Sequence, residues 1–75
     1  MTAALTDEAL DLLRAADAQR IALVHRTYLI DAVEVPVVTA HLLDDLRFDG
    51  WLYVQDLRLG VRLVLPTVRG MELLS

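Results

Sequence analysis

The spacing of apolar residues at the start of the chain predicts a helix over residues 6–18. Thr6 is a suitable N-cap, and the carboxylates of Asp7 and Glu8 favour the positive end of a helix. Leucine and alanine also occur outside a single stripe of this helix, a pattern typical of a helix that is covered on more than one side. We therefore expect a second subunit to cover part of residues 5–18.

The next segments are short. The run IALVH at residues 21–25 favours a strand, with continuation of the first helix as the alternative. Apolar residues at spacings of three and four then predict two helices, over residues 27–33 and 36–48. Pro36 suits the first turn of a helix but not its interior, so the break between them falls at residues 33–35. A helix, a turn and a second helix form a helix-turn-helix.

After the second of these helices the period of the apolar residues changes to two. This predicts strands over residues 51–54 and 61–65, joined by a hairpin loop or a longer ribbon over residues 55–60. A last short helix is expected over residues 68–74. The predicted fold class is α+β, mainly α with a small β-ribbon, in the order α-β-α-α-β-β-α within a single domain spanning residues 1–75.

Composition narrows the possible classes of function. The chain has 75 residues, of which 56% are hydrophobic, so we expect some apolar surface to face a partner. The chain contains no cysteine, which excludes a disulfide framework and a thiolate metal site. No apolar stretch is long enough to cross a bilayer, and the first residues lack the pattern of a secretory signal. The expected location is the cytoplasm, with no membrane partner.

The candidate chemical groups do not predict an enzyme. The sequence has no glycine-rich phosphate loop and no Ser-His-Asp or Cys-His set. His25 and His41 lie far apart without the carboxylate–histidine spacing of a metal site, so neither a metal nor another cofactor is expected. Asp44 and Asp45 are adjacent on a predicted helix and point in different directions, which favours a solvated face over paired carboxylates.

Three segments follow one another in an order that resembles a known family. Residues 39–52, TAHLLDDLRFDGWL, are similar to a recognition helix that runs into the start of a wing. Residues 51–65 are similar to the wing itself, and residues 67–74, TVRGMELL, to the helix that follows it. Together, residues 29–74 resemble the winged helix-turn-helix domains of the MarR, ArsR and PadR-like transcription regulators of bacteria and archaea.

The resemblance implies a DNA-binding transcriptional regulator that acts as a homodimer. Helix 36–48 would enter the major groove, and the wing at residues 55–62 would contact the backbone of double-stranded DNA. The dimer is expected to form through residues 5–18, with residues 68–74 as a further candidate segment. The candidate DNA-binding residues are Arg26, Val37, Val38, Thr39, His41, Arg58 and Arg62.

The residues expected to face the bases depart from the family pattern. Of these, only Thr39 and His41 can hydrogen-bond a base edge, and Val37 or Val38 can contact a thymine methyl group. The arginines are better suited to phosphate, but the net charge of −4 opposes non-specific binding to a polyanion. The alternative function is therefore a winged-helix protein–protein interaction module that does not bind DNA.

Overall fold

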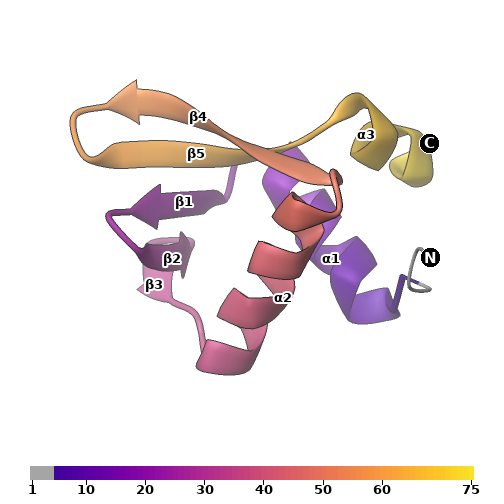
Figure 1. The fold of residues 1–75 in the computed structure, drawn as a ribbon, viewed down its shortest axis with the longest axis horizontal. Helices are drawn as coiled ribbons and strands as arrows, with labels where there is room; N and C mark the ends of the chain where they lie inside the picture. Colours follow the sequence, from indigo (N-terminus) through magenta and orange to yellow (C-terminus); the bar gives the residue numbers. More distant parts are fainter. Residues whose placement is uncertain (1–4) are drawn as a thin grey trace.

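The computed structural model describes residues 5–75, which form three helices and five strands (Figure 1). The fold class is α+β, as predicted. None of the described helices is long and apolar enough to cross a membrane. The elements in chain order are α1 (Asp7–Asp17), β1 (Ile21–Val24), β2 (Thr27–Ile30), β3 (Val33–Glu34), α2 (Val37–Phe48), β4 (Leu52–Arg58), β5 (Val61–Pro66) and α3 (Val68–Leu74).

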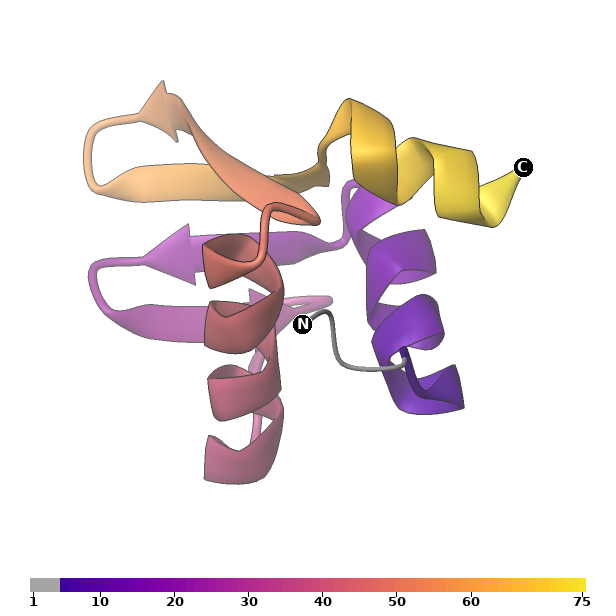
Figure 2. The same cartoon turned by 45° about the vertical axis from the view of Figure 1, so that its right-hand side comes forward.

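The strands form one antiparallel sheet in the order β3-β2-β1-β5-β4. Because β1 pairs with β2 on one side and with β5 on the other, the β1–β2 and β4–β5 hairpins are neighbours. Helix α2 lies in front of the strands in Figure 2, against one face of the sheet. This inner face carries Ile21, Leu23, Tyr28 and Val64, which are buried in a core shared with α1 and α2.

The predicted helix over residues 27–33 is wrong, because this segment forms β2, the turn that follows it and the first residue of β3. Its first residues pair with β1, and Tyr28 is buried in the core. Asp31 and Ala32 have φ values of 53° and 67°, and two consecutive positive φ values are typical of the type I′ turn that joins antiparallel strands. The described residues therefore contain no helix-turn-helix. A five-stranded sheet replaces the small ribbon of the predicted, mainly α fold.

Other predicted elements are confirmed. The strand expected at residues 21–25 is present as β1, and the helix expected over residues 36–48 is α2, with Pro36 as its N-cap. The last helix is α3, which begins after Thr67. The Oγ1 atom of Thr67 accepts a hydrogen bond of 3.2 Å from the backbone N–H of Gly70, and this capping bond explains why the helix begins where it does.

Helix α1 confirms the prediction for residues 6–18 but not the reason for expecting a subunit against it. The Oγ1 atom of Thr6 accepts a hydrogen bond from the backbone N–H of Ala9 at 3.1 Å, as an N-cap does. The helix contacts α2, α3 and β5 of its own chain. Its several-sided apolar pattern is therefore explained within one chain, and a dimer through residues 5–18 stays a prediction. The buried residues of α1 are Ala9, Leu12, Leu13, Ala15 and Ala16.

The β4–β5 hairpin is longer than the two predicted strands. Strand β4 continues as far as Arg58, so the loop expected over residues 55–60 is reduced to Leu59 and Gly60. The pairing register shifts between Asp56 and Arg58, which is the signature of a β-bulge. Bulges protect the exposed edge of a sheet and redirect side chains. This bulge places Arg58 on the opposite face of the hairpin from Arg62.

Candidate nucleic-acid interface

The turns of the β1–β2 and β4–β5 hairpins lie side by side at one end of the sheet (Figure 1). The backbone N–H of His25 donates a hydrogen bond to the carbonyl oxygen of Gly60 over 3.4 Å. Gly60 has a φ of +76°, and a Cβ atom built there would lie 3.6 Å from Cε1 of His25. The space at Gly60 would admit a Cβ atom, so it is the left-handed backbone conformation of this turn that favours glycine.

A groove of about 370 Å³ lies between these hairpins and α2. Its cationic side chains come from three elements: Arg26 from the β1–β2 turn, Arg62 from β5 and Arg47 from α2. One acidic side chain, Asp44, also lines it. With three guanidinium groups and one carboxylate, the formal charge lining the groove is +2, opposite in sign to the net charge of −4 of the whole chain.

A buried tyrosine positions one of these arginines. Nη1 of Arg47 donates a hydrogen bond to the hydroxyl oxygen of Tyr28 over 2.8 Å, and that hydroxyl donates to Oδ1 of Asp44 over 2.5 Å. Burial, and next the hydrogen bond to Asp44, raise the pKa of Tyr28 above its ordinary value. The hydroxyl therefore stays protonated and holds Arg47 against the wall of the groove.

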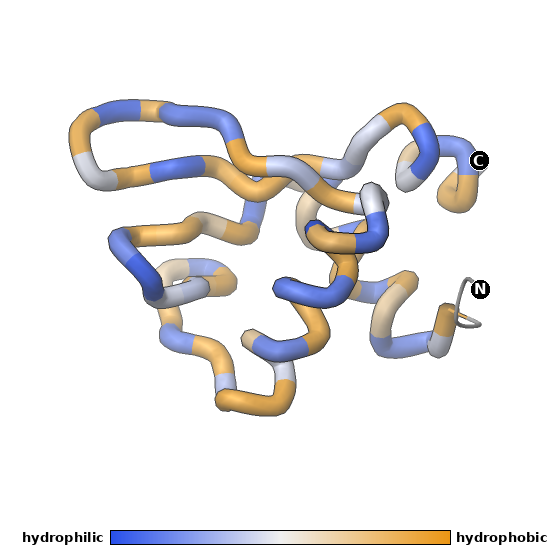
Figure 3. The backbone as a smooth tube through the Cα atoms, in the orientation of Figure 1, coloured by the Kyte–Doolittle hydropathy of each residue, from blue (hydrophilic) through white to orange (hydrophobic). Residues whose placement is uncertain are grey.

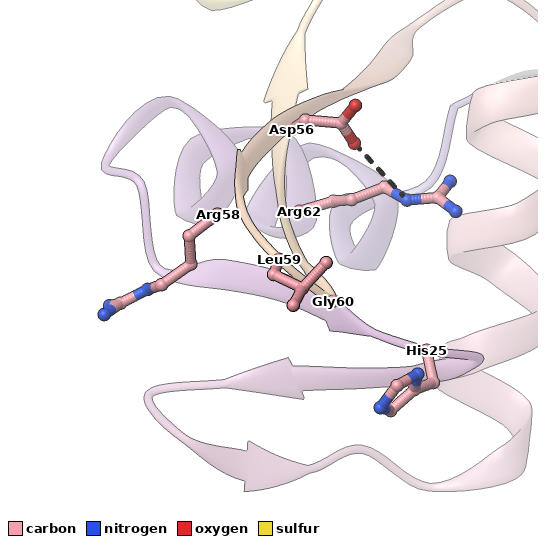
Figure 4. Close-up of a pocket in the computed structure, with 6 residues that line it drawn as sticks. All are labelled: His25, Asp56, Arg58, Leu59, Gly60 and Arg62. Carbon is pink, nitrogen blue, oxygen red and sulfur yellow. Dashed lines mark ion pairs between the residues drawn. The ribbon is translucent and has the colours of Figure 1, made fainter.

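The second cavity, of about 360 Å³, lies at the ends of the hairpins (Figure 4). Within it Nε of Arg62 lies 3.7 Å from Oδ1 of Asp56, its direct partner across β4 and β5. Arg58 pairs instead with Val61, the neighbour of Arg62, and the two arginine side chains point in different directions in Figure 4. Because of the bulge, the end of the hairpin carries a guanidinium group on each face.

Arg26 and Arg58 are available for an external anion. Within residues 5–75, neither side chain forms an ion pair or a hydrogen bond. We call His25, Arg26, Arg47, Arg58 and Arg62 the basic cluster. The remaining arginines lie elsewhere and are engaged: Arg14 with Asp11 at 2.9 Å, Arg20 with Asp31 at 2.6 Å, and Arg69 over the ring of Trp51 at 4.2 Å.

The α2 residues that were expected to face the bases do not line this groove. Val37 and Val38 are 71% and 75% exposed, His41 is exposed, and Thr39 is half-buried. The structure thus brings Arg26 and Arg62 together and sets Arg58 beside them, but leaves the other four candidates apart from the basic cluster. The α2 residues that do line the groove are Ala40, Asp44 and Arg47, spaced by four and three.

Sequence reasoning missed two members of the basic cluster. His25 was expected within a strand, whereas its φ of 57° places it in the β1–β2 turn. Arg47 follows Asp44 by three residues, a spacing that by itself indicates only an ion pair on a helix surface. Its partner Tyr28 lies in a segment that was predicted to be helical. A correct strand prediction for this segment could have indicated the contact between Tyr28 and Arg47. A strand beside β1 places Tyr28 next to α2.

The chemistry of this surface is that of anion binding. It offers guanidinium and imidazole donors, and the described residues include no group of three or more histidine, aspartate or glutamate side chains that could hold a metal ion. Comparison of the chain with protein-family models, with curated proteins and with solved structures gave no match.

Proposed function

We propose that this chain is a DNA-binding transcriptional regulator that contacts the backbone of double-stranded DNA through the basic cluster. One observation carries the proposal: four of the seven arginines gather at one end of a protein whose net charge is −4. Guanidinium groups suit the bidentate recognition of phosphate.

The members of the cluster have different parts in this proposal. Arg26 and Arg58 have no acidic partner among the described residues, so they bind phosphate without first breaking an ion pair. Arg47 and Arg62 are oriented by Tyr28 and Asp56, which reduces the entropy lost when they bind. In this arrangement α2 lies beside the phosphates and the end of the β4–β5 hairpin acts as the wing.

The fold supports the proposal in part. We interpret it as a variant of the winged helix in which a β-hairpin, β2–β3, replaces the second helix. The elements that favour this interpretation are α1, the pairing of β1 with β5, and the succession of α2 and the β4–β5 hairpin. The missing helix is the one that precedes the recognition helix, so the family's mode of docking α2 in the major groove does not transfer directly.

In this proposal, binding depends more on contacts to the DNA phosphates than on contacts to the base edges. The outward side chains of α2 include Val37, Val38 and His41, and of these three only His41 is able to hydrogen-bond a base edge. Backbone contacts release counterions, so the affinity falls steeply as salt rises. If the four arginines each neutralise one phosphate, the slope of log K against log salt is roughly −3 to −4.

The test is a fluorescence-anisotropy titration of a labelled DNA duplex at several salt concentrations. Arg26→Ala and Arg58→Ala should each weaken binding and reduce the salt slope by about 1. Arg14→Ala is the matched control, because this arginine lies on α1 and pairs with Asp11. Unchanged binding in the first two variants, or no binding by the unaltered chain even at low salt, would contradict the proposal.

The second candidate is a protein–protein interaction module that does not bind DNA. It is favoured by the apolar residues along the outward side of α2, where Val37, Val38 and Phe48 are 71%, 75% and 92% exposed. Apolar surface of this kind is typical of a protein interface. The same titration separates the two candidates, because this one predicts no binding to DNA at any salt concentration.

A further inference from the structure

The face of the sheet turned away from the core is largely apolar, with Thr27 and Gln55 as its uncharged polar residues. Direct pairing places Ala22 of β1 between Leu29 of β2 and Leu63 of β5, and it places Val24 beside Val61. Tyr53 of β4 pairs with Leu65 on the same face. In Figure 3 most of β1 and β5 has the colour of hydrophobic residues. We call this surface the outer face; its apolar residues are Ala22, Val24, Leu29, Tyr53, Val61, Leu63 and Leu65.

No described element covers the outer face. Six of its seven apolar residues are partly exposed and Tyr53 is 43% exposed, and none of the seven belongs to the hydrophobic core or packs against it. Helices α1 and α2 pack on the inner face (Figure 2). An antiparallel sheet with one face in water normally carries polar residues on that face, and apolar residues on both faces indicate a sheet that is covered on both.

The charges of the outer face are distributed unevenly. Glu34 on β3 pairs with Leu29 and therefore shares this face, and Arg58 on β4 shares it through its pairing with Val61. Strands β3 and β4 are the two edges of the sheet. One edge of the apolar surface is therefore acidic and the opposite edge is basic, while the centre, formed by β1 and β5, is uncharged.

We propose that the outer face binds the outer face of a second copy of this chain, forming a two-fold symmetric sandwich. A two-fold axis parallel to the strands places β1 against its own counterpart and β3 against β4 of the second copy. Glu34 of each copy then lies at the same edge as Arg58 of the other, so charges of opposite sign share each edge of the dimer. The register separates these two residues by two positions along the strand, roughly 7 Å, so they attract each other without forming a direct ion pair, and Arg58 keeps its donors for an external anion. Sheets packed in this way lie about 10 Å apart, which leaves room for the apolar side chains between them.

Helix α3 extends this surface. Tyr53 lines a shallow depression together with Val68 and Met71, which are 77% and 42% exposed. Five strands spaced by about 4.8 Å place the two edge strands about 19 Å apart, and α3 adds to that span. In the proposed dimer, residues 68–74 therefore lie at the side of the interface, and the sheet forms its centre.

The proposed axis has a consequence that rests on the proposed function. An axis parallel to the strands keeps the hairpin turns of both copies at the same end of the dimer. The two basic clusters therefore point in one direction and can contact one DNA molecule together.

The test measures the mass of the full chain by sedimentation equilibrium over a range of concentrations. The expected species is a dimer of the 8.4 kDa chain. Leu63→Gln should weaken dimerisation at least tenfold, because it places an amide at the centre of the interface. Val38→Gln is the control, since this valine is exposed on α2, and it should leave the dimer unchanged. Circular dichroism checks that each variant is folded.

Charge reversal tests the orientation of the two copies. Glu34→Arg and Arg58→Glu should each weaken the dimer, and the double variant should restore it. A wild-type chain that stays monomeric, or a dimer unaffected by Leu63→Gln, would overturn the proposal. A dimer that Leu63→Gln disrupts but the charge reversals do not would overturn the proposed axis.

DNA binding is measured separately. A monomer that binds DNA contradicts the sandwich alone, and a dimer that does not bind DNA contradicts the proposed function alone.

Discussion

The two faces of the sheet are built from the same kinds of residue and have different surroundings. On β5, Val64 points to the inner face and is fully buried, whereas its neighbour Leu63 points to the outer face and is partly exposed. On β1, Leu23 and Ala22 differ in the same way. The helices distinguish the two faces, since α1 and α2 pack on the inner one only. The apolar residues of a strand thus show that at least one of its faces is buried, but not how many of its faces are covered.

The largest difference should appear when neighbouring residues of β5 are truncated. Val64→Ala leaves a cavity in the core and should lower the free energy of unfolding by about 2 kcal/mol. Leu63→Ala should cost less than about 1 kcal/mol in dilute solution, because its side chain is already partly in water. Urea unfolding followed by circular dichroism measures both. Equal costs in dilute solution would contradict the assignment of the two faces.

A smaller effect is expected where α3 meets the strand on the inner side. A Cβ atom at Gly70 would lie 2.5 Å from the carbonyl oxygen of Trp51, so Gly70→Ala should force the backbone apart and cost about 1 to 2 kcal/mol. Met71→Ala, on the neighbouring exposed residue of α3, is the control and should have little effect on unfolding of the monomer. A stabilised Gly70→Ala variant would show that the helix does not pack as described.

The smallest effect concerns the hydroxyl of Tyr28 on the inner face. Tyr28→Phe removes the hydrogen bonds to Asp44 and Arg47 and should cost about 1 kcal/mol at neutral pH. Because folding raises the pKa of Tyr28, its contribution is complete below the unfolded pKa of about 10 and is lost as pH rises through the folded value. The variant should lack this alkaline loss of stability.

Tyr53→Phe is the control for this prediction, since Tyr53 is 43% exposed on the outer face. Unfolding curves recorded between neutral and alkaline pH compare the two variants with the unaltered chain. If Tyr28→Phe keeps the full alkaline decline, the loss of stability arises from another group.

The local sequence determined most of the elements. Threonines at positions 6 and 67 and the proline at position 36 predicted the beginnings of all three observed helices, because capping and proline geometry act over a single turn. The strands after the second helix were predicted from their period of two. The sequence also indicated, from its apolar content, that a surface remains for a partner.

Only the tertiary structure decided what residues 27–33 form and which residues make up the basic cluster. This segment fits both a helical and an alternating pattern, and it becomes a strand because β1 lies beside it and Asp31 and Ala32 adopt a tight turn. Arg26 and Arg62 meet because β1 pairs with β5 across a long separation in sequence. Such pairing depends on the packing of the whole chain, so no local pattern of residues determines it.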